Sequence, residues 1–189
     1  MKEKSIVIIA AIGLFVGCIL GMCGSIVSSP EFRSVAWGTG SASLILAAAL
    51  LTVFYFRKGY DLLAAGFLIY AIAETAVFSS CATDLDRNIP SFAAGAFLWA
   101  LSIAVLSVQK AFPLFVRCTG IIAAISFAIV SILIFTGHPV NALAKPLPFF
   151  AYPFFAATLA GWGWTLLRKH SRMMVNSEDV QTEKIIRTK

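Results

Sequence analysis

Histidine, cysteine and charge are all scarce in this sequence of 189 residues. It contains 2 histidines and 4 cysteines, and 13% of its residues are charged. The cysteines form no Cys-x-x-Cys pair and have no histidine close by, which argues against a zinc site or a disulfide-rich scaffold. Neither histidine stands beside a serine or cysteine in a recognisable catalytic arrangement. We therefore expect a protein that is not an enzyme.

Several sequence motifs that are diagnostic of a function are also absent. The sequence has no GxGxxG, P-loop, HExxH or GxSxG pattern and no Asn-x-Ser/Thr glycosylation acceptor. It therefore predicts no cofactor and no metal. The net charge of +6 does not indicate nucleic-acid binding, because the basic residues cluster at the ends of apolar runs and do not line one polar face.

Long apolar runs dominate what is present. Apolar residues make up 59% of the chain, against about 45–50% in ordinary soluble domains. A helix needs about 20 apolar residues to cross a membrane, and short connections force neighbouring helices to be antiparallel. The sequence therefore predicts an all-α integral membrane protein, a compact up-and-down bundle of six transmembrane helices. These are expected at 5–27, 35–56, 62–80, 89–108, 116–135 and 147–167.

The lysines and arginines predict the orientation of this bundle. Basic residues concentrate in the cytoplasmic connections of membrane proteins. The other side of the predicted bundle carries only Arg33, Arg87 and Lys145. We therefore place both termini in the cytoplasm, in a plasma membrane or a bacterial inner membrane. Twelve of the 15 basic residues fall on the cytoplasmic side: Lys2, Lys4, Arg57, Lys58, Lys110, Arg117, Arg168, Lys169, Arg172, Lys184, Arg187 and Lys189.

The first apolar run has an alternative interpretation as a cleaved signal peptide, because Lys2 and Lys4 precede it. The run is longer than the usual apolar core of a signal, and no clean Ala-x-Ala site follows it. We expect it to remain as a helix. Cleavage would leave five helices, with the carboxyl end still in the cytoplasm.

Glu74 is the one acidic residue that lies well inside an apolar run. A carboxylate at membrane depth costs about 2.5–3.5 kcal/mol on insertion scales for Asp, and such residues usually face a protein interior or a wet cavity. Tyr70 shares its helix face, and Trp99 is expected at a similar depth in the next helix. The indole N–H of Trp99 needs an acceptor in the membrane, and Glu74 could supply it if the two faces meet.

Three interpretations of Glu74 follow. In the first, a protonated Glu74 holds helices together by hydrogen bonds. In the second, Glu74 binds or relays a proton or a cationic solute in an outward-facing cavity of the outer half, with Tyr70, Trp99 and His138 as further candidates. In the third, Glu74 joins His138 and the cysteines in a metal or redox site on the outer side. Cys23 and Cys81 could instead form a disulfide there. Our first functional prediction is transport or ligand binding around Glu74.

A stripe of small residues marks the first helix. Gly13, Gly17 and Gly21 recur every fourth residue, a spacing that lets two helix backbones approach closely. The stripe predicts close packing inside the bundle. The alternative is docking of a partner subunit or a second copy, which would make the protein a non-catalytic accessory or scaffold.

The last apolar run and the tail complete the chain. The predicted helix at 147–167 contains Pro153, which would bend it, and Trp162 and Trp164, which we expect to anchor it at the lipid headgroups. The polar tail at 168–189 is expected to be cytoplasmic. Its residues Arg168, Lys169 and Arg172 are expected to bind anionic lipid of the inner leaflet.

Overall fold

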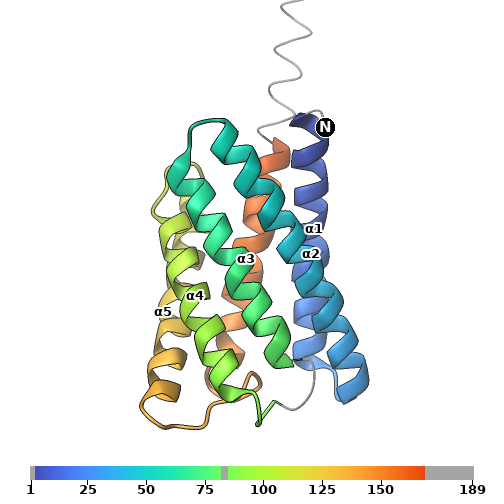
Figure 1. The fold of residues 1–189 in the computed structure, drawn as a ribbon, viewed down its shortest axis with the longest axis vertical. Helices are drawn as coiled ribbons and strands as arrows, with labels where there is room; N and C mark the ends of the chain where they lie inside the picture. The colour runs from blue at the N-terminus through green and yellow to red at the C-terminus, as the bar shows by residue number, and fades with distance from the viewer. Residues whose placement is uncertain (1–2, 82–84, 169–189) are drawn as a thin grey trace, which may run out of the picture.

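The chain folds into helices that run side by side along one axis. The structure, a computed structural model, describes residues 3–81 and 85–168, without the side chains of 80 and 81. No strand occurs within these ranges. The long helices are α1 (Glu3–Ile26), α2 (Pro30–Arg57), α3 (Asp61–Cys81), α4 (Ile89–Ser107), α5 (Leu114–Phe135) and a last helix at 152–168, which follows the short 3-10 helix η1 (Phe149–Ala151) (Figure 1).

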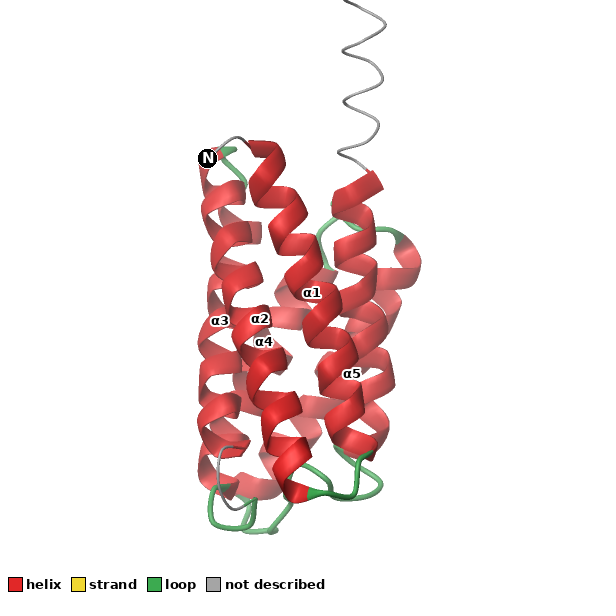
Figure 2. Ribbon diagram, turned by 90° about the vertical axis from the view of Figure 1, so that its right-hand side faces the viewer, coloured by secondary structure: helices red, strands yellow, loops and turns green. Residues whose placement is uncertain are grey.

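Successive helices are packing neighbours. Each of the pairs α1 and α2, α2 and α3, α3 and α4, and α4 and α5 is in direct contact. The last helix contacts both ends of this series, because its Gly161 lies against Val116 of α5 and its Gly163 lies against Phe15 of α1. The connections gather at the two ends of the bundle (Figure 2). Within the described residues, the six long helices thus form one closed, up-and-down bundle.

The two ends of the bundle carry different parts of the chain. The N-terminus and the end of the last helix lie at the same end (Figure 1), which we call the N-terminal end. The connections after α1, α3 and α5 lie at the other end, which we call the opposite end. The N-terminus and the end of the last helix lie together because the chain runs along the bundle an even number of times between them.

Five of the helices, α1 to α5, are long and apolar enough to cross a membrane. Their outward faces carry large apolar side chains, such as Ile12 at 57% exposure and Phe115 at 68%. Water would not solvate such a surface well, whereas lipid chains would. The described helices therefore have the character of a multi-pass membrane protein.

Helix α2 begins at Pro30, earlier than the expected residue 35. The side chain of Ser29 caps it by accepting a hydrogen bond from the Phe32 backbone N–H at 3.3 Å. Proline suits the first turn of a helix because its missing N–H would have no partner there. The apolar run underestimates this helix because its first turn is polar, with Glu31 and Arg33.

The last α-helix begins at residue 152, later than the expected 147. Pro146 and Pro148 belong to turns before it, and η1 fills the gap. Pro153 therefore lies in the first turn, where no intrahelical hydrogen bond is lost, so it gives no reason for a bend.

The two tryptophans of the last helix lie in different environments. Trp164 is 63% exposed, in line with a lipid-facing anchor, but Trp162 is fully buried at 0%. Its ring packs edge-on against Phe67 and Tyr70, with centroids at 5.4 and 5.8 Å. The prediction that Trp162 is an anchor was therefore wrong, because residues two apart on a helix face different ways.

Candidate functional site

Glu74 is the centre of a hydrogen-bonded cluster between three helices. Its side chain is buried, with 3% of the residue exposed. The hydroxyl of Ser41 in α2 donates to Glu74 Oε1 at 2.6 Å, and the indole N–H of Trp99 in α4 donates to Oε2 at 2.9 Å. The structure thus brings together Glu74 and Trp99, as their similar expected depths suggested, and adds Ser41.

Tyr70 lies one turn before Glu74 on the same face of α3. Its ring is fully buried, and its hydroxyl approaches the Glu74 carboxyl without a hydrogen bond of good geometry. A carboxylate offers about four acceptor positions over its two oxygens. Ser41 and Trp99 occupy two of them, so the carboxyl retains capacity for another donor.

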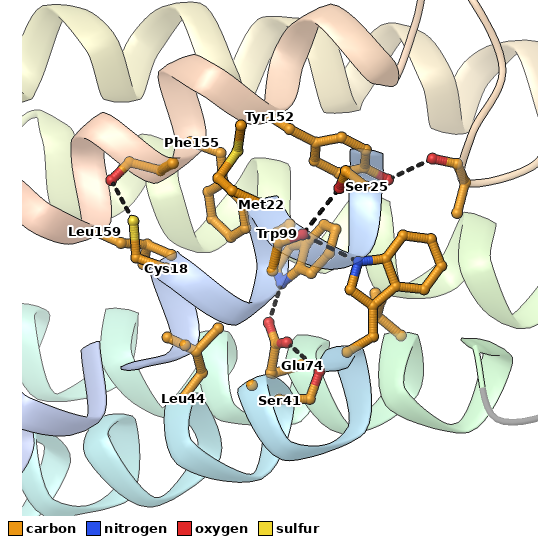
Figure 3. A pocket seen from close by; sticks show the side chains of 17 residues that line it. Cys18, Met22, Ser25, Ser41, Leu44, Glu74, Trp99, Tyr152, Phe155 and Leu159 are labelled. Atoms are coloured by element: carbon orange, nitrogen blue, oxygen red, sulfur yellow. Dashed lines mark hydrogen bonds between the residues drawn. The ribbon is translucent and has the colours of Figure 1, made fainter. Parts of the chain in front are cut away.

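A cavity of about 60 Å³ adjoins this cluster. Glu74, Ser41 and Leu44 lie on one side of it, and Cys18, Met22 and Phe155 lie on the other (Figure 3). Its lining residues come from α1, α2, α3, α4, the connection after α5 and the last helix: Gly17, Cys18, Gly21, Met22, Ser25, Trp37, Gly40, Ser41, Leu44, Glu74, Val77, Trp99, Ala142, Tyr152, Phe155, Ala156 and Leu159.

Glycines create room for this cavity. The stripe of α1 faces α2, where Gly13 lies against Ser43 and Ala47, and Gly17 against Leu44. A Cβ added at Gly21 would meet nothing within 4 Å. Gly21 therefore borders open space, whereas its neighbours in the stripe make close helix contacts.

The wall nearest the opposite end is fixed by hydrogen bonds. Trp37 donates its indole N–H to the Gly21 carbonyl at 3.1 Å, and Tyr152 donates its hydroxyl to the Ala142 carbonyl at 2.7 Å. Ala142 lies in the connection between α5 and the last helix. The amide of the adjacent Asn141 donates to Asp86 at 2.8 Å, which ties this connection to the one before α4.

The lining of the cavity contains an acidic group but no basic group. It contains one carboxyl group, three hydroxyl groups and one thiol, but no lysine, arginine or histidine. Four aromatic rings complete it, those of Trp37, Trp99, Tyr152 and Phe155. Such a site can accept hydrogen bonds and stabilise positive charge, and it offers no basic group to balance an anion.

The other predicted residues lie apart from Glu74. His138 is exposed and contacts Thr136 at 3.3 Å, and it does not line the cavity. Cys23 is half-buried and also outside the lining. The side chain of Cys81 lies outside the described residues, so its disulfide with Cys23 stays a prediction. Among the described residues, no group of three or more His, Cys, Asp or Glu is placed to hold a metal.

Sequence reasoning missed Ser41, Trp37, Cys18 and Tyr152 as members of the site. The run Gly38-x-Gly40-Ser41 consists of small residues, which favour a close helix contact, and it is the one sequence signal that points toward Ser41. Lys169 and Arg172, predicted to bind lipid, lie outside the described residues.

Comparison with family models, with characterised proteins and with solved structures found no match to this chain.

Proposed function

We propose that this chain is a multi-pass membrane protein that binds a small solute in the cavity at Glu74, as the binding step of solute capture or transport. One observation carries the proposal: a buried carboxyl group, inside an apolar bundle, borders a cavity. A carboxyl at membrane depth is costly, and such groups commonly mark solute or ion paths. Its unused acceptor positions give a solute a polar contact.

The orientation of the cavity supports access from outside the cell. Ser25, Trp37 and Tyr152 place it toward the opposite end of the bundle. Lys58, Lys110 and Arg117 lie toward the N-terminal end, which the bias of basic residues assigns to the cytoplasm. The cavity would then serve an outward-facing state.

The alternatives gain less support. A docking stripe should leave its glycines on an outer face, but Gly13 and Gly17 pack against α2 and Gly21 borders the cavity. A metal or redox site would need His138 near Glu74, and His138 does not line the cavity.

A thermal-shift screen tests the proposal. The purified full chain in detergent would be unfolded in the presence of a panel of small amines, alcohols, amides and carboxylates. A ligand that binds only the folded state raises the unfolding temperature in a concentration-dependent way. We expect at least one class to do so with the wild type and not with Glu74→Gln.

The matched control is Ser131→Ala. Ser131 is also buried, but its hydroxyl bonds the Ala93 and Phe127 carbonyls and does not line the cavity. This variant should keep the response. A panel without any effect on the wild type, or an undiminished response in Glu74→Gln, would contradict the proposal.

A further inference from the structure

We propose that the solute bound at Glu74 is a small ammonium cation of about the size of methylammonium. This inference rests on the proposed function and names its ligand class. It depends on the charge, the walls and the size of the cavity, which are independent of one another.

The charge of the lining favours a cation. Glu74 is the one acidic residue among the lining residues, and no basic residue accompanies it. The Ser41 hydroxyl and Trp99 indole already donate to the carboxyl, so both protons are committed. A ligand that donates N–H bonds to the remaining acceptor positions of Glu74 fits this arrangement. An anion would meet the carboxyl without a counter-charge.

The walls favour an organic ammonium over a bare metal ion. Cations bind over aromatic faces within about 6 Å of the ring centroid, and ammonium ligands use such sites. Trp37, Trp99, Tyr152 and Phe155 supply rings on several sides of the cavity. A hard metal ion of the calcium type would need six to eight oxygen ligands. The lining offers one carboxyl and three hydroxyls.

The size limits the ligand further. A cavity of roughly 150 Å³ holds benzene, with six carbon atoms, so each heavy atom takes roughly 25 Å³. The cavity of about 60 Å³ then accommodates roughly two or three heavy atoms. Methylammonium fits, whereas tetramethylammonium exceeds this volume.

Cys18 provides a native reporter of the charge preference. It lines the cavity opposite Glu74 (Figure 3), and its thiol donates to the Ala156 carbonyl at 3.4 Å. The experiment uses the full chain with Cys23, Cys81 and Cys118 replaced by serine. The rate of Cys18 modification is measured in detergent with cationic aminoethyl methanethiosulfonate and with anionic sulfonatoethyl methanethiosulfonate. The rates are corrected for the rates of both reagents with a free thiol.

We expect the cationic reagent to react at least about tenfold faster, because the Glu74 carboxylate attracts it in a poorly solvated cavity. Glu74→Gln should remove most of this preference while Cys18 still reacts. Methylammonium chloride should slow the reaction in the Glu74 protein at concentrations where methanol and sodium chloride do not.

Each contrary result has a separate meaning. If both reagents react equally fast, or if methanol protects as well as methylammonium, the cation inference fails and the solute-binding proposal stands. If methylammonium protects the Glu74→Gln protein equally, the inference fails as well. If Cys18 reacts with neither reagent, nor with the smaller silver ion, until the protein is unfolded, the cavity is closed and both proposals fail.

Discussion

At the scale of single residues, Glu74 joins α2, α3 and α4 through two hydrogen bonds with good distances. Hydrogen bonds between membrane helices contribute about 0.6 kcal/mol on average and up to about 1.7 kcal/mol. The cluster therefore adds modestly to stability and fixes the direction of the carboxyl group. A carboxyl held in place from two sides is already positioned for a third partner.

The contribution of the Trp99 hydrogen bond can be isolated with a matched pair of variants. Trp99→Phe removes an N–H that donates to Glu74, whereas Trp162→Phe removes a buried N–H without a hydrogen-bond partner among the described residues. Both lose the same ring area, and both sites are almost fully buried. We expect Trp99→Phe to lower the free energy of unfolding by about 1 kcal/mol more than Trp162→Phe.

Reversible unfolding in mixed detergent would measure this difference. In a Glu74→Ala background the extra cost of Trp99→Phe should vanish, because the acceptor is gone. Equal costs for the two tryptophans in the wild-type background would show that the hydrogen bond does not stabilise the bundle.

The sequence could predict that Glu74 and Trp99 meet, because their positions along the bundle axis are enough to suggest this contact. The rise per residue along antiparallel helices puts Glu74 and Trp99 at one level, which needs only the topology. Prediction from the sequence failed where the rotation of a helix about its axis decides. Trp162 and Trp164 have the same depth to within one turn, yet one is in the core and the other faces outward. Nothing in a uniformly apolar helix reveals that rotation, since both faces are hydrophobic.

At the scale of elements, α1 and α2 pack closely beside the site, with Gly13 and Gly17 at their contact. Small residues let their backbones approach, and van der Waals contact then stabilises the pair in a solvent as apolar as the side chains. The stripe has two different roles along its length, since Gly13 and Gly17 form the contact and Gly21 leaves space.

Alanine substitutions along the stripe separate these roles. A Cβ at Gly13 would lie 2.8 Å from the Ser43 carbonyl oxygen, a backbone atom that cannot rotate away. We expect Gly13→Ala to destabilise the bundle by about 1–3 kcal/mol through overpacking. Gly21→Ala meets no atom within 4 Å and should leave stability unchanged or raise it by up to about 1 kcal/mol, because alanine favours the helix.

Thermal unfolding of both variants beside the wild type would check this contrast. An equal loss for Gly21→Ala would mean that α1 packs with another rotation, and the assignment of Gly21 to the cavity wall would then fail.

Helix existence could be predicted from the apolar runs, while some helix ends could not. The run length fixes where a chain can cross hydrocarbon, but the hydrogen-bonded helix continues into polar residues, as α2 does over Glu31 and Arg33. Prolines have the opposite effect, because they make a helix begin later than its apolar run. Pro146 and Pro148 belong to an apolar run, and the run alone does not say that the helix begins only at residue 152.

At the scale of the whole molecule, the bundle presents apolar side chains outward and holds Glu74, the one buried carboxyl group of the described ranges, inside. The N-terminal end carries the Lys58–Glu3 ion pair at 3.0 Å, between the α2–α3 turn and the start of α1. The cavity lies toward the opposite end. A molecule with this arrangement has a built-in direction, provided that the basic end faces the cytoplasm.

The most direct test of a solute site open to the outside is the side from which Cys18 can be modified. The chain with Cys18 as its one cysteine would be placed in right-side-out and inverted vesicles. It would then be treated with silver ions, which bind thiols, are smaller than the cavity and do not cross membranes. A cysteine that has bound silver is recognised by its failure to react with a maleimide after unfolding. A control chain lacks the four native cysteines and carries Lys110→Cys. It reports which side of the membrane the N-terminal end of the bundle faces, because residue 110 is exposed there.

We expect Cys18 to react in right-side-out vesicles and Lys110→Cys to react only in inverted ones. Protection of Cys18 from both sides in the folded protein, or its reaction only in inverted vesicles, would contradict a cavity at Glu74 that receives its solute from outside.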